Sequence, residues 1–300
     1  MAIDTVPSKL LDPLVASALQ PADVGTAAAE DVAAGGTGDL ARVDNPAITA
    51  AATVGLADGD ARGIPRHLGN WTPTGGSAPV ALWQMTQANV AAMAASSTDI
   101  PDLIGSLDLA LTGTALHGYL SNGLSGFHID GGTTLKTSIA PALQITGAVT
   151  VHFQAEVRKE PPTNGIFFGV YESGESLVTN GLIDLRTASP DQLRVTLEYG
   201  AAGTDSVYSP PVDAELTAAL WSLTRASDGV NYTLYRDGLL VASWTQGHAA
   251  EKAGSGNIQY LQLGLNGLEY TIAALGFWAE EHSDAQVLEI ATAAWGGATP

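Results

Sequence analysis

The chain has 300 residues and a formal net charge of −19, and 45% of its residues are apolar but only 6% aromatic. Because so acidic a surface repels a phosphate backbone, we expect no nucleic-acid partner. The absence of cysteine excludes disulfides and thiolate metal sites.

The N-terminal segment is poor in the bulky side chains that a core needs. Within residues 1–20, apolar side chains recur at helical spacing, which predicts a short helix that packs on its own chain or docks on a partner. Residues 21–63 are rich in Ala and Gly, so a single copy cannot bury enough surface to offset its ordering entropy. We expect a flexible arm or a strand that gains its core by association, with a disordered linker as the alternative.

Residues 64–78 contain several Pro and Gly residues and mark the predicted domain boundary. This divides the chain into an arm over residues 1–77 and a second domain over residues 78–300. The N-terminus lacks the pattern of a signal peptide, and no apolar stretch is long enough to span a membrane. We therefore expect synthesis in the cytoplasm and no membrane insertion.

Short apolar runs separated by turn signals follow residue 78. Residues 148–157 alternate most clearly between apolar and polar side chains, which predicts a strand with one buried and one polar face. His152 falls on the polar face, where we expect it to be solvated. Residues 123–137 predict two strands joined by a turn at Gly131-Gly132, with Phe127 and Ile129 on one face of the first and Leu135 starting the second. The remaining predictions are strands over 79–85, 107–111, 166–171, 182–185, 193–199, 258–263 and 270–278, a helical turn over 88–95, and a final helix over 283–295 capped by Ser283.

Residues 221–244 carry the strongest turn signal in the chain. Alternating runs flank Asp237-Gly238, and these two residue types tolerate the positive φ of a tight hairpin. Many short strands joined by turns favour an antiparallel sandwich, whose core would hold Trp83, Trp221 and Trp278.

The order of these pieces resembles a known family. An early strand at 79–85 is followed by the motif-bearing segments 123–135, 145–157, 221–243 and 260–291. In this order they resemble a concanavalin A-like jelly roll of the laminin-G-like (LamG) kind. The N-terminal segment contains Ser17-Ala18-Leu19-Gln20-Pro21 and Ala28-Ala29-Glu30-Asp31-Val32. With these phrases it resembles the head of a phage tail fibre or other virion appendage. The implied fold is mainly β: an antiparallel concanavalin A-like (LamG) jelly-roll sandwich after an extended, partly helical attachment and oligomerisation segment.

The resemblance implies a structural subunit of a phage fibre or spike on the virion surface. Such a subunit would form a homotrimer, attach to other virion proteins through residues 1–77, and contact a host cell-surface glycan through its lectin-like domain. Two alternatives remain: a capsid or head decoration protein that binds no sugar, and a carbohydrate-active enzyme.

Catalytic signals are weak. Glucanases with the concanavalin A-like fold carry alternating acids on one strand, but here Arg158 stands between Glu156 and Glu160. The histidines form no metal-binding pair in the sequence. We therefore expect no enzyme and no cofactor, with calcium as the alternative.

Two kinds of candidate binding residue remain. A calcium ion at the sandwich rim would draw on Asp205, Asp228 and Asp237, although the last two are also ordinary turn residues. A sugar site would need an exposed aromatic ring, and Tyr208 and Trp244 are the best candidates. Tyr208 is predicted in a loop and Trp244 at the end of a strand.

Overall fold

The computed structural model describes residues 65–96, 99–130, 132–138, 140–143, 145, 147–159, 164–172, 178–186, 192–198, 204–208, 218–246, 259–265 and 268–297. The helix predicted within residues 1–20 and the segment 21–63 lie outside the described residues. All described strands and helices lie in one compact unit that runs from Arg66 to Ala294. This unit starts upstream of residue 78, and the role of residues 1–77 as an arm stays a prediction.

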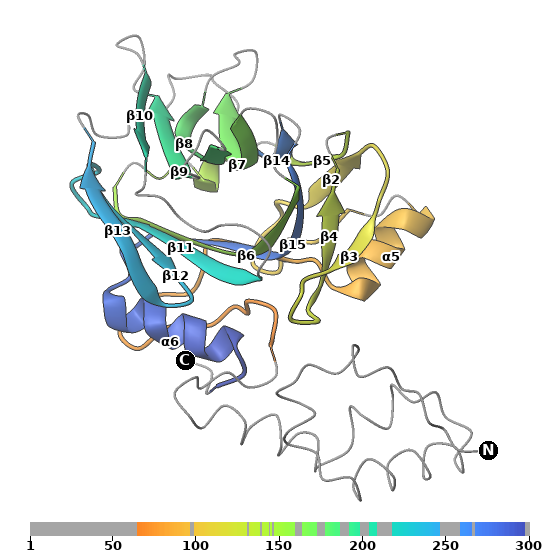
Figure 1. Ribbon diagram of the computed structural model, residues 1–300, viewed down its shortest axis with the longest axis horizontal. Coiled ribbons are helices and arrows are strands. Elements are labelled where there is room, and N and C mark those ends of the chain that lie inside the picture. The colour runs from red at the N-terminus through yellow and green to blue at the C-terminus, as the bar shows by residue number, and fades with distance from the viewer. Residues whose placement is uncertain are drawn as a thin grey trace, which may run out of the picture. The chain divides into compact units, whose positions relative to one another are not determined.

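Two antiparallel sheets form the unit, as predicted (Figure 1). Sheet A has eight strands: β13 (Leu239–Thr245), β12 (Asn231–Arg236), β11 (Ala219–Arg225), β6 (Val149–Lys159), β15 (Glu269–Trp278), β4 (Ser125–Ile129) and β3 (His117–Tyr119) in that order, with β1 (Ala81–Gln84) also paired to β15. Sheet B has seven: β10 (Thr204–Tyr208), β9 (Gln192–Glu198), β8 (Val178–Arg186), β7 (Asn164–Glu172), β14 (Gln259–Leu265), β5 (Thr134–Thr137) and β2 (Leu109–Thr112). Three helical segments complete the unit: α5 (Gln87–Ser96), the short 3-10 helix η1 (Pro141–Leu143) and α6 (Asp284–Ala294).

The core fills the space between the two sheets. The ring of Phe153 on β6 packs against that of Phe168 on β7 with centroids 5.3 Å apart, so an aromatic contact joins sheet A to sheet B. Trp83 and Trp221 are buried in the same core, as predicted. Trp278 is also fully buried, but it packs against His152 instead.

The predicted hairpin between β12 and β13 is confirmed. Asp237 and Gly238 both adopt positive φ, 52° and 82°, as the tight turn requires. The carboxylate of Asp237 accepts a 2.9 Å hydrogen bond from Leu220 N, which ties the turn to β11. The turn rests on α6, because a Cβ added at Gly238 would lie 3.0 Å from side-chain atoms of Leu288 and Ala291.

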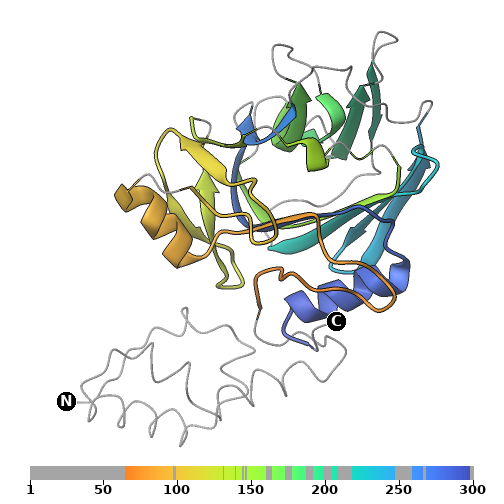
Figure 2. The same cartoon turned by 180° about the vertical axis from the view of Figure 1, so that it is seen from behind.

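Helix α6 covers the outer face of sheet A, the face that points away from sheet B (Figure 2). Ser283 caps it: Oγ accepts a hydrogen bond from Gln286 N, and Oε1 of Gln286 accepts one from Ser283 N. None of the helices in the described part of the chain is long and apolar enough to cross a membrane.

Residues 66–77 also cover the outer face of sheet A, and we call this segment the strap. Leu68 is fully buried, and its N–H donates a 2.7 Å hydrogen bond to Oε1 of Gln154. The Gln154 amide in turn donates to Arg66 O at 2.7 Å. Strap and helix together explain why the expectation of a solvated His152 is wrong: its strand is buried on both faces.

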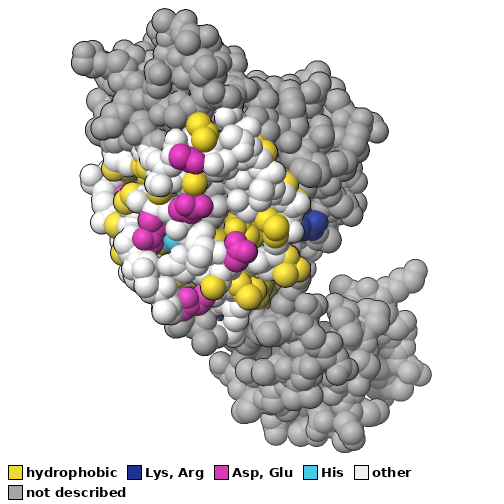
Figure 3. Space-filling model, turned by 90° about the vertical axis from the view of Figure 1, so that its left-hand side faces the viewer, with side chains coloured by type: hydrophobic (Ala, Val, Ile, Leu, Met, Phe, Trp, Pro, Cys, Tyr) yellow, Lys and Arg dark blue, Asp and Glu magenta, His cyan; other side chains and the backbone are white. Residues whose placement is uncertain are grey.

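The described surface carries the acidic balance that the composition predicts. On the face shown in Figure 3, acidic side chains are spread among apolar and uncharged ones, and basic side chains lie only at its margin. Such a surface disfavours polyanionic partners.

Candidate functional site

A polar groove lies at the β2 edge of sheet B and has a volume of about 410 Å³. One wall comes from the segment that links α5 to β2, and the other from β2, β5 and the residue after β5. The lining residues are Asp99, Ser106, Asp108, Ala110, Thr112, Lys136, Thr137 and Ser138. Since only Ala110 is apolar, nearly every side chain in the groove can donate or accept a hydrogen bond.

Strand pairing explains why Ala110 and Lys136 reach the groove. They are paired residues on β2 and β5, and both are exposed, whereas Leu109 and Leu135 are fully buried. Successive side chains on a strand point to opposite faces, so burial of the leucines turns Ala110 and Lys136 outward. The core of the sandwich thus sets one wall of the groove.

The other wall is fixed by Asp102, which is 7% exposed. Its carboxylate accepts hydrogen bonds from the backbone N–H groups of Leu82, Ile104 and Leu107 at 3.1, 3.1 and 3.3 Å. Asp108 Oδ1 accepts a 2.9 Å hydrogen bond from Asp102 N. These bonds hold the loop that carries the acidic wall in one conformation, because two of the donors to Asp102 belong to the loop itself and the third, Leu82 N, ties the loop to β1.

Lys136 lies over an aromatic ring. Its Nζ is 3.5 Å from the ring centroid of Tyr260, a half-buried residue on β14. This cation–π contact is worth about 0.5–1 kcal/mol at such a site, so it favours one position of the ammonium group. The groove therefore presents two carboxylates, those of Asp99 and Asp108, against one ammonium.

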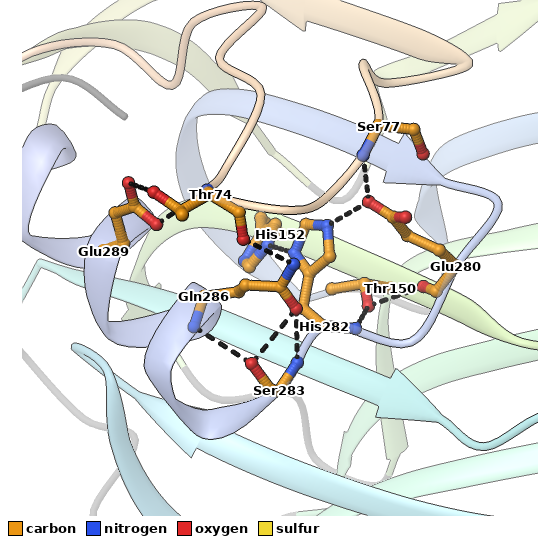
Figure 4. Close-up of polar contacts among 9 residues, drawn as sticks. All are labelled: Thr74, Ser77, Thr150, His152, Glu280, His282, Ser283, Gln286 and Glu289. Atoms are coloured by element: carbon orange, nitrogen blue, oxygen red, sulfur yellow. Dashed lines mark hydrogen bonds and ion pairs between the residues drawn. The ribbon is translucent and has the colours of Figure 1, made fainter.

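A second polar cluster lies on the outer face of sheet A, beneath the strap and α6 (Figure 4). Ser222 Oγ is 2.7 Å from Nδ1 of His152, and Nε2 of His152 is 3.0 Å from Nδ1 of His282. Nε2 of His282 is 3.2 Å from Oε1 of Glu280, which also accepts a 2.6 Å hydrogen bond from Ser77 N. A hydroxyl, two imidazoles and a carboxylate in this order resemble the relay of a nucleophilic enzyme.

Burial argues against catalysis by this cluster. Ser222 and His152 are 0% exposed and His282 is 1% exposed, so a substrate has no route to the hydroxyl. Desolvation, with a contribution from His282, holds the pKa of His152 well below 6.5, and desolvation lowers the pKa of His282 despite the nearby Glu280 carboxylate. The pair is therefore neutral at pH 7, and the cluster joins the strap and α6 to sheet A.

The two predicted sugar-binding residues lie on edge strands of different sheets, and neither lines the groove. Tyr208 is the last residue of strand β10 and does not lie in a loop. The structure does not describe its side chain. The Trp244 ring stacks on Tyr232 with centroids 5.8 Å apart and an interplanar angle of 8°. A role for either residue in binding sugar stays a prediction.

The predicted calcium ligands have other partners where they are described. Asp228 Oδ1 accepts hydrogen bonds from the backbone N–H groups of Val230 and Asn231 at 2.9 and 3.1 Å, which lowers the pKa of its carboxyl. The carboxylate of Asp237 binds Leu220 N and stabilises the hairpin turn. The structure does not describe the side chain of Asp205. The described residues contain no group of three or more side chains that could hold a metal ion.

Of the alternating acids predicted around Arg158, Glu156 lies on β6 and forms an ion pair with Arg158. Oε1 of Glu156 lies 2.8 Å from Nη1 of Arg158, and Glu156 is 3% exposed. Glu156 also accepts a hydrogen bond from Ser121 N. Glu160 lies outside the described residues.

No protein-family model matches the chain, and no curated protein matches it in sequence. Among solved structures, the binding domain of botulinum neurotoxin DC in complex with rat synaptotagmin II aligns with a TM-score of 0.54 and 11% identity, over 72% of this chain and 51% of that chain. The same domain in complex with SialylT aligns with a TM-score of 0.53 and 11% identity, over 71% and 51%.

A structure of botulinum neurotoxin type C, whose cell entry depends on two ganglioside molecules, gives a TM-score of 0.52 and 11% identity over 71% of this chain and 51% of that chain. The chain thus matches about half the length of these proteins. At this identity the likeness concerns the fold, and it confirms the predicted antiparallel jelly-roll sandwich.

Proposed function

We propose that the sandwich is a recognition domain that binds a carbohydrate on a host cell surface. The observation that carries this proposal is the polar groove on a fold shared with receptor-binding domains. Those domains are described in complex with synaptotagmin II and with SialylT, and cell entry of the type C toxin depends on gangliosides.

The groove suits a sugar for a physical reason. A saccharide carries many hydroxyl groups, and each one that leaves water needs a new hydrogen-bond partner if binding is to be favourable. Carboxylates accept from hydroxyls, the Lys136 ammonium donates to their oxygens, and Ser and Thr do both. The volume of about 410 Å³ falls within the usual range for small-ligand sites, about 300–1,000 Å³.

We further propose that the protein is a homotrimeric subunit of a phage fibre or spike. Of the predicted arm over residues 1–77, the part that precedes the strap would attach to other virion proteins. The support is the poverty of residues 21–63 in large apolar side chains, which association of three copies would relieve. Light scattering of the full chain should give a trimer mass. A monomer would contradict the fibre role while leaving carbohydrate binding by the sandwich untouched.

A glycan array probed with the full chain tests carbohydrate binding. We expect saturable binding to a subset of glycans, and binding to host cells that is lost after the cells are stripped of surface glycan. Binding to neither glycans nor cells would favour the capsid decoration alternative. Cleavage of a bound glycan, abolished by changing one acid, would favour the enzyme.

A further inference from the structure

We propose that the groove between Asp99, Asp108 and Lys136 is the carbohydrate site and that it takes a neutral glycan in preference to a sialylated or sulfated one. This inference rests on the proposed function and adds the location of the site and the class of sugar. It departs from the solved structures that resemble this chain, where the glycans described are SialylT and gangliosides.

The side chains of the lining favour a ligand rich in hydroxyl groups. Most small-molecule sites are lined mainly by apolar and aromatic side chains with a few polar groups, whereas seven of the eight residues that line this groove have polar side chains. An apolar ligand would strip water from the carboxylates and hydroxyls without replacing their hydrogen bonds. A polyhydroxylated ligand replaces them, so the groove selects for sugar.

The charge of the lining distinguishes neutral from acidic sugars. Asp99 and Asp108 place two negative charges on one wall, and Lys136 places one positive charge on the other. A carboxylate or sulfate on the ligand would pair with Lys136 only while it shares the groove with two like charges, and in contrast to charges far apart on the surface, charges in one groove are weakly screened by salt. The net charge of −19 adds a repulsion of longer range.

Asp108 and Lys136 are positioned before a ligand arrives. The loop before β2 is held by the three backbone hydrogen bonds to Asp102, and Asp108 is bound to the backbone of the same residue. Lys136 is held over Tyr260. A site ordered in advance loses less entropy on binding, so a shallow groove can hold a short saccharide.

The test uses the full chain and an array on which each neutral glycan is printed beside its sialylated and sulfated derivatives. Asp99→Asn and Asp108→Asn keep the shape of each side chain and remove its charge. Glu281→Gln is the matched control, because Glu281 is exposed, lies between β15 and α6, and makes the same change in net charge. Unchanged melting temperatures would show that all three variants fold.

We expect the wild type to bind neutral members at least tenfold more tightly than their acidic derivatives. Asp99→Asn and Asp108→Asn should each weaken the affinity for neutral glycans about tenfold and reduce the preference for neutral over acidic glycans. Glu281→Gln should change neither the affinity nor the preference. A wild type that prefers acidic glycans would overturn the inference, and so would two groove variants that both keep the wild-type affinity for neutral glycans. Either result would leave the proposal of carbohydrate binding intact. Binding to no glycan at all would overturn the proposed function together with it.

Discussion

Nε2 of His152 and Nδ1 of His282 lie 3.0 Å apart, although 130 residues separate them in the chain. The ring of Trp278 packs edge-on against both imidazoles, with centroids 4.9 Å from His152 and 5.5 Å from His282. These three rings fill the space between sheet A and the elements that cover it. The stability of the fold should therefore depend on the protonation state of the two histidines.

We expect the free energy of unfolding to decrease as the pH falls below 6.5. Burial lowers the pKa values of His152, His282 and His67 below 6.5 in the folded protein. In the window below 6.5 the unfolded chain binds protons that the native state does not, so stability is fully present above this window and is lost as the pH falls through it. The slope is at most about 1.4 kcal/mol per pH unit for each histidine.

Urea unfolding at a series of pH values from about 5 to 8 measures this slope, with His282→Gln as the comparison. Titration of the acidic surface affects wild type and variant alike, so the difference between their slopes reports the histidine pair. We expect a smaller slope in the variant. Equal slopes would mean that the pKa values of the pair are the same in the folded and the unfolded protein.

Gly238→Ala should destabilise the protein more than Gly123→Ala. Both glycines have positive φ, 82° and 85°, so each substitution carries a conformational penalty of about 1–2 kcal/mol. A Cβ at Gly238 would also press on Leu288 and Ala291 of α6, whereas nothing lies within 4 Å of one at Gly123. We expect about 1 kcal/mol of additional loss by urea unfolding. Equal losses of unfolding free energy in the two variants would contradict the contact between the hairpin turn and α6.

Ser283→Ala should remove the N-cap of α6 and lower the free energy of unfolding by about 1 kcal/mol. Ser227→Ala is the control, since Ser227 lies exposed in a turn and its change should stay within about 0.5 kcal/mol. Chemical denaturation of both variants makes the comparison. Similar effects from the two substitutions would contradict the capping geometry.

Trp244→Ala should affect stability and leave the affinity for glycan unchanged. The ring stacks on Tyr232 and packs against the core, but it is only partly buried, so its truncation should cost somewhat less than the roughly 3–5 kcal/mol of a fully buried Trp. Trp244→Phe should recover part of this loss. A variant that keeps its stability and loses glycan binding would instead support the site predicted from the sequence.

Local patterns predicted much of the fold. The alternation in residues 148–157 predicted β6, Asp237-Gly238 predicted the hairpin, and Ser283 predicted the start of α6. Each of these signals depends on neighbours in the chain, which is why it can be read without the structure. The short strands β3 and β10 were missed, because neither carries a clear alternation and prolines follow Tyr208 closely.

The sites depend on contacts between distant segments and were not predictable in the same way. Alternation on β6 assigns His152 to the polar face, but it does not reveal that the strap and α6 cover that face. The groove arises because pairing of β2 with β5 brings Asp108 near Lys136. No local motif marks either arrangement, and charged residues in loops are common in any acidic chain.

The most direct test of the account maps a bound glycan onto the sandwich by amide chemical-shift changes in the full chain. The glycan is the strongest neutral binder from the array. We predict that the largest shifts fall on Asp108, Ala110, Thr112 and Lys136. Shifts centred on β13, or on the buried cluster around His152, would contradict the claim that this protein recognises sugar through the groove at the edge of sheet B.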